Sequence, residues 1–131
     1  MSQLARAAVL CASVLSAASG CVGSSDAVAD PQSVALYDVA NDEFRKGRYR
    51  EALHKVNEAL EADGDNADAL HLGALIYVAF CARGTESADC RFADAERMAR
   101  RAVSENSELR DAKNTLGVIL IHQKKYDEAI E

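Results

Sequence analysis

One short pattern occurs twice in the sequence, with 77 residues between equivalent positions. Residues 44–52 and 121–129 each contain an apolar residue, a polar turn, a tyrosine and the pair Glu-Ala. A related stretch, Phe-Ala-Asp-Ala at residues 92–95, lies between them. Ala59 lies seven residues after Ala52, and Ala102 lies seven residues after Ala95. Seven residues correspond to about two turns of α-helix, so the pattern predicts repeated helical units with small residues on one face.

The composition favours helices over strands. The 131 residues include 25 alanines, one proline and no tryptophan, and alanine has the highest helix propensity. Hydrophobic residues make up 49% and charged residues 27%, which is too apolar for a disordered chain. The formal net charge of −6 excludes a large basic footprint for nucleic acid. We therefore expect one small all-α domain and no nucleic-acid partner.

The pattern resembles the tetratricopeptide repeat, a helical hairpin of about 34 residues. In this family a small residue, a turn, an aromatic residue, two alanines and a second turn recur at fixed positions. In the copy that begins at Ser33 these positions are Ala40, Gly47, Tyr49, Ala52, Ala59 and Gly64, and the last of them has glycine in place of the usual proline. The resemblance implies an α-α superhelix of about two and two-thirds repeats. The repeats are expected at residues 33–66, 67–109 and 110–131, and the incomplete third implies a truncated chain or a partner that supplies the missing surface.

Local signals mark several boundaries of the predicted helices. Asp30 can cap a helix whose first residue is Pro31, because a carboxylate accepts bonds from the free N–H groups and proline lacks one. Gly47 and the run Asp-Gly-Asp-Asn at residues 63–66 predict turns between helices.

The second repeat is nine residues too long for the family pattern, and the excess lies between its two helices. Cys81 and Cys90 bracket this inserted loop, residues 82–90. We predict a disulfide between them; free thiols and a metal site with His71 are the alternatives, although the spacing matches no usual zinc site.

The N-terminus is typical of a secretory signal. Residues 7–18 form an almost continuous run of small and apolar side chains behind Arg6. The run Ala-Ser-Gly-Cys at residues 18–21 resembles a bacterial lipobox, in which the cysteine is acylated. This resemblance predicts a signal peptide over residues 1–20, a lipid on Cys21, and a flexible tether over 21–32. Ordinary cleavage after residues 27–29, and an uncleaved anchor, are the alternatives.

The first helix of each tetratricopeptide hairpin lines a concave groove. The resemblance therefore assigns a binding role for a partner segment to Tyr37, Asn41, His71, Leu75, Asn114, Val118 and His122. These side chains are apolar, amide or imidazole, which suits a bound polypeptide. The groove lacks the lysine and arginine set with which chaperone-type members of the family clamp a terminal carboxylate.

No catalytic motif is evident. His54, His71 and His122 are scattered one per repeat, and no nucleophile lies in a recognisable motif beside them. We expect no enzyme activity, cofactor, metal or small-molecule substrate.

The lipobox and repeats together resemble outer-membrane lipoproteins that help pilus or secretion pores to assemble, such as type IV pilus pilotins and social gliding motility lipoproteins. The expected function is a scaffold at the periplasmic face of the outer membrane that binds another envelope protein; an accessory of a cell-wall enzyme is the alternative.

Overall fold

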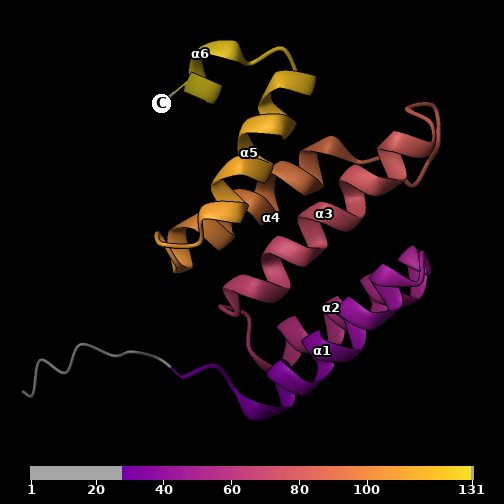
Figure 1. The fold of residues 1–131 in the computed structure, drawn as a ribbon, viewed down its shortest axis with the longest axis vertical. Coiled ribbons are helices and arrows are strands. Elements are labelled where there is room, and N and C mark those ends of the chain that lie inside the picture. The colour runs from indigo at the N-terminus through magenta and orange to yellow at the C-terminus, as the bar shows by residue number, and fades with distance from the viewer. Residues whose placement is uncertain (1–27, 131) are drawn as a thin grey trace, which may run out of the picture.

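The computed structural model describes residues 28–130 and contains six α-helices in this range (Figure 1). Their bounds are α1 Pro31–Arg45, α2 Tyr49–Ala62, α3 Ala67–Arg83, α4 Phe92–Glu105, α5 Arg110–His122 and α6 Tyr126–Ile130. Consecutive helices pair as hairpins that stack in chain order (Figure 1). The described part contains no β-strand, so the predicted all-α superhelix is confirmed as the fold class.

The predicted leader falls outside this range. The signal peptide of residues 1–20, Cys21 and most of the tether over 21–32 lie outside the described residues, as does Glu131. Between residues 28 and 130, no helix combines the length and the apolar character needed to cross a membrane.

The start of α1 and the turns of the hairpins follow local sequence signals. The Asp30 carboxylate accepts hydrogen bonds from the backbone N–H groups of Gln32 at 2.9 Å and Ser33 at 3.2 Å, which confirms the predicted cap. Gly47 links α1 to α2 with φ 75°, a left-handed conformation that glycine adopts at little cost. Lys124 occupies the equivalent place between α5 and α6 with φ 62°, so the same turn forms there without glycine.

The core is built around alanine. Five alanines at the predicted small positions have no exposed surface: Ala40, Ala52, Ala59, Ala95 and Ala102. A methyl side chain lets helix backbones approach closely, and the larger side chains of Leu70, Ile76 and Ile119 fill the space between hairpins. Ala129, the equivalent of Ala52 in the third hairpin, is only half-buried because α6 has five residues in the described range.

A buried polar cluster joins the first two hairpins. The Ser33 hydroxyl of α1 donates to the backbone carbonyl of Ala59 in α2 at 2.8 Å. Asn66, the N-cap of α3, donates from Nδ2 to Ser33 Oγ at 2.9 Å and accepts from the Ala69 N–H at 3.1 Å. Because every polar atom of the cluster is bonded, it carries little desolvation penalty and sets how α3 docks on the first hairpin.

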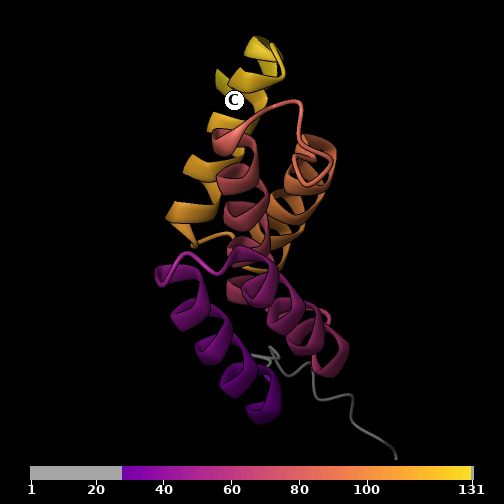
Figure 2. The same ribbon diagram turned by 90° about the vertical axis from the view of Figure 1, so that its right-hand side faces the viewer.

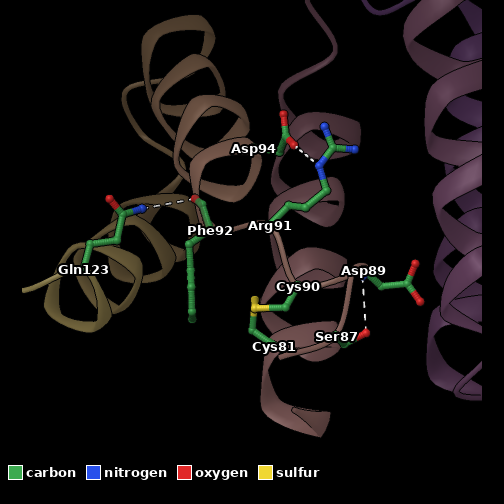
Figure 3. The surroundings of a disulfide bond; sticks show 8 residues. All are labelled: Cys81, Ser87, Asp89, Cys90, Arg91, Phe92, Asp94 and Gln123. Carbon is green, nitrogen blue, oxygen red and sulfur yellow. Dashed lines mark hydrogen bonds and ion pairs between the residues drawn. A yellow bond between two sulfur atoms is a disulfide. The ribbon is translucent and has the colours of Figure 1, made fainter. Parts of the chain in front are cut away.

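The insert of the second hairpin is closed by a disulfide between Cys81 and Cys90 (Figure 3). Cys81 lies in α3, which continues through Ala82 to Arg83, so the connecting loop spans residues 84–91. Asp89 in this loop accepts a 2.6 Å hydrogen bond from Nη2 of Arg50, which docks the loop on α2.

Candidate functional site

The odd-numbered and even-numbered helices lie on opposite sides of the molecule. In Figure 2, α1, α3 and α5 gather on one side and α2 and α4 on the other. The three odd helices also run in nearly the same direction, so their first turns lie along one edge (Figure 1). We call the surface that they present the odd-helix face.

All seven side chains assigned to the predicted groove belong to the odd helices. Tyr37 and Asn41 of α1 are half-buried, as are His71 and Leu75 of α3, whereas Asn114, Val118 and His122 of α5 are exposed. The spacing of four residues on each helix places the members of that helix in one row. The site predicted from the sequence therefore corresponds to one row on each of three adjacent helices.

His71 is the centre of a contact between the second and third hairpins. Its Nε2 lies 3.0 Å from the Thr115 hydroxyl of α5, close enough for a hydrogen bond. Burial lowers the pKa of His71 below its ordinary value of 6.5, and the charges of Asp111 and Asp68 oppose this shift. A half-buried imidazole that is neutral at physiological pH can exchange a hydrogen bond with a hydroxyl without bringing a charge into the site.

Acidic side chains surround this contact. Burial raises the pKa of Tyr37 above its ordinary value of 10.0, and the charges of Asp68 and Asp38 raise it further. Asp68 and Asp111 are exposed residues in the first turns of α3 and α5. Within residues 28–130, neither of these carboxylates forms a salt bridge. These two carboxylates therefore bring negative charge to this edge, beside the basic side chain of Arg110 at the start of α5.

Apolar side chains occupy the other half of the odd-helix face. On α5, Val118 is 47% exposed and Ile121 is 53% exposed, and Leu75 of α3 is half-buried. Aliphatic surface of this kind is stabilised when another polypeptide covers it, at roughly 25 cal/mol for each Å² removed from water.

His122, which the sequence assigns to the groove, packs against another helix of the same chain. Its ring stacks on Phe92 at the start of α4, with 5.4 Å between ring centroids and 21° between planes. The following residue, Gln123, donates from Nε2 to the Phe92 carbonyl at 3.1 Å (Figure 3). These contacts hold the end of α5 against α4, so His122 has an intramolecular packing role at the border of the predicted groove.

Thr115 is a neighbour of the candidate site that the sequence did not reveal. Its hydroxyl meets His71, which lies 44 residues earlier in the chain. A threonine inside an amphipathic helix carries no signal of such a partner, because helical periodicity shows only which face it occupies.

Two clefts flank the insert and form a second candidate region. Their volumes are about 290 and 370 Å³, and their charged lining residues include Arg50, Arg83, Asp89 and Arg91. These groups already have partners: Arg50 bonds to Asp89, Arg91 lies 2.5 Å from Asp94, and the Arg83 guanidinium lies 4.3 Å from the Tyr49 ring centroid. A ligand would have to displace these contacts, so we place the candidate site on the odd-helix face.

The described residues offer no competing metal centre. Within residues 28–130, no group of three or more His, Cys, Asp or Glu side chains could hold a metal ion. Cys81 and Cys90 are joined to each other, so neither supplies a thiolate ligand to a site with His71.

Comparison with known proteins agrees with this geometry. A family model described as tetratricopeptide repeat matches residues 37–79 and 91–131, and the gap between the two matches falls on the insert. Among solved structures, this chain is similar to the second tetratricopeptide repeat domain of Spaghetti (RPAP3), which was solved with the HSP90 peptide SRMEEVD bound. The two sequences are 22% identical, and the match has a TM-score of 0.66 and covers 76% of this chain and 83% of the Spaghetti chain. The first domain of Spaghetti, bound to the same peptide, is 24% identical, with a TM-score of 0.66 and coverage of 75% and 71%. No curated protein matches the sequence.

Together, the stacked hairpins, the buried alanines at repeated positions and the family match over most of the described range lead to one assignment. Stacked repeats of this kind form extended concave surfaces that repeat proteins use for binding. The chain belongs to the tetratricopeptide repeat family.

Proposed function

We propose that the protein is a non-enzymatic scaffold that binds an extended segment of a partner protein across its odd-helix face. The observation that carries this proposal is the pair of exposed aliphatic residues Val118 and Ile121 in the same row as Asn114. Aliphatic side chains supply area, and an amide can bond to the backbone of an extended chain. The two Spaghetti domains were solved with a bound peptide, which supports a peptide as the class of ligand.

The test is selection of binders from a displayed library of random peptides by the full chain. Val118→Asp should weaken the selected binders by at least about tenfold, because it places a charge against their apolar side chains. Val39→Asp is the matched control, since Val39 is also 47% exposed but lies about 160° around α1 from both Tyr37 and Asn41 at 100° per residue. A library that yields no binder, or binders equally sensitive to both substitutions, would refute the proposal.

We also propose that the chain is anchored in the cell envelope by a lipid on Cys21 and assists assembly of a pilus or secretion pore. The supporting observation is the lipobox-like run at residues 18–21 followed by small and polar residues. Cys21→Ser should move the protein from the membrane fraction to the soluble fraction. Cross-linking of the protein in its native host identifies its partner. Recovery of a cell-wall enzyme, instead of a pore subunit, would favour the role of an enzyme accessory.

A further inference from the structure

The odd-helix face has an acidic edge. Asp68 and Asp111 lie in the first turns of α3 and α5, and these turns share one edge because the odd helices run in the same direction (Figure 1). Both carboxylates act on His71, and Asp68 also acts on Tyr37. Two acidic groups from neighbouring helices therefore converge on one part of the face without a salt-bridge partner in residues 28–130.

The opposite half of the same face is apolar. Val118 and Ile121 follow Asp111 along α5, and Leu75 follows Asp68 along α3. The apolar residues thus lie toward the C-terminal ends of the helices and the carboxylates toward their N-terminal ends. A segment that crosses the helices meets negative charge along one of its sides and aliphatic surface along the other.

We propose that the partner segment is basic and apolar, with lysine or arginine side chains at Asp68 and Asp111 and aliphatic side chains at Val118 and Ile121. This inference rests on the proposed function and names the chemistry of its ligand. Opposite charges across an interface steer association and exclude partners of the wrong sign. An acidic peptide such as SRMEEVD, which the Spaghetti domains bind, would bring carboxylates against carboxylates here.

Two synthetic peptides test the chemistry directly. A peptide of about eight residues reaches ~26 Å, which is enough to cross three helices spaced ~9 Å apart. One peptide alternates lysine with leucine and valine, and the other has glutamate at each lysine position; both have blocked termini, so that only side-chain charge differs. Titration against the full chain should show binding of the lysine peptide and at least about tenfold weaker binding of the glutamate peptide.

Charge variants separate a specific site from general attraction to a negatively charged protein. Asp68→Asn combined with Asp111→Asn should weaken the lysine peptide by roughly tenfold, because exposed ion pairs contribute up to about 1 kcal/mol each. Glu61→Gln combined with Glu105→Gln removes the same charge from exposed positions on α2 and α4 and should leave the affinity within about twofold.

The outcomes distinguish this inference from the proposed function. Three results would overturn the inference. They are an equal loss of affinity in the two double variants, equal binding of the two peptides, and a lysine peptide that does not bind. If the displayed library still yields binders sensitive to Val118→Asp, and they are acidic or uncharged, the peptide-binding function stands with a different ligand chemistry. If the library yields none, both are refuted.

Discussion

At the scale of single residues, two glycines in equivalent helices have opposite surroundings. A Cβ atom added at Gly73 in α3 would collide with the terminal methyl of Met98, approach the Met98 sulfur to 2.8 Å and lie 3.2 Å from Val56. A Cβ atom added at Gly117 in α5 would meet nothing within 4 Å. Gly73 therefore permits close contact of α3 with α2 and α4, whereas Gly117 only costs helix stability.

The same substitution should have opposite effects at the two positions. Gly73→Ala should lower the free energy of unfolding by about 1–3 kcal/mol, because it overfills a packed contact. Gly117→Ala should raise it by about 0.5–1 kcal/mol, because alanine loses less conformational entropy than glycine in a helix. Urea denaturation followed by circular dichroism measures both. Destabilisation by Gly117→Ala would show that the space beside α5 is occupied.

At the scale of elements, the insert is the main departure from a regular repeat. The disulfide ties the last turn of α3 to the loop before α4, and the bond between Arg50 and Asp89 holds that loop against α2. The ion pair is exposed and contributes little by itself. The covalent link is therefore the dominant restraint on the insert.

Removal of this link should destabilise the protein measurably. Cys81→Ser combined with Cys90→Ser should lower the free energy of unfolding by about 2.5–3 kcal/mol, the loop-closure entropy of a ring of roughly ten residues. A reductant should lower the urea midpoint of the wild-type chain and leave that of the double variant unchanged. The prediction would be wrong if the oxidised wild type and the double variant had identical urea midpoints. It would also be wrong if a thiol reagent labelled Cys81 and Cys90 stoichiometrically in the unreduced wild type.

At the scale of the whole molecule, the burial of His71 between the second and third hairpins should make the stability of the stack depend on pH. The pKa of His71 is lower in the folded protein than its ordinary 6.5 because the side chain is half-buried. The unfolded chain therefore binds more protons than the folded chain below about pH 6.5, so stability falls as the pH drops from this value to the folded-state pKa. Asp68 and Asp111, the acidic groups that face the imidazole, oppose this shift.

A histidine variant isolates this effect. Between about pH 7.5 and about pH 5, the wild type should lose more stability than His71→Gln, which keeps an amide able to bond to Thr115. Glu96 adds little in this window, because its pKa lies below the ordinary 4.5 and its contribution disappears only at lower pH. The measurement is the urea midpoint at each pH; parallel curves for the two proteins would show that His71 does not carry the dependence.

Much of the fold and the outline of the site follow from the sequence. The positions of Ala52, Ala59, Ala95 and Ala102 predict buried helix contacts, and all four are fully buried. The pairing of Cys81 with Cys90 follows from their position around an insert. The rows on α1, α3 and α5 follow from helical periodicity, although their role in binding stays a prediction.

The sequence by itself determined which residues form helices, which face of each helix is buried and where the regular repeat is interrupted. Only the tertiary structure decided that Ser33 meets Asn66, that His71 meets Thr115 and that the His122 ring covers Phe92. The physical reason is that helix periodicity and capping act within a few residues of the chain. Contacts between hairpins depend instead on how each hairpin is rotated against the next, which is set jointly by all the side chains packed between them.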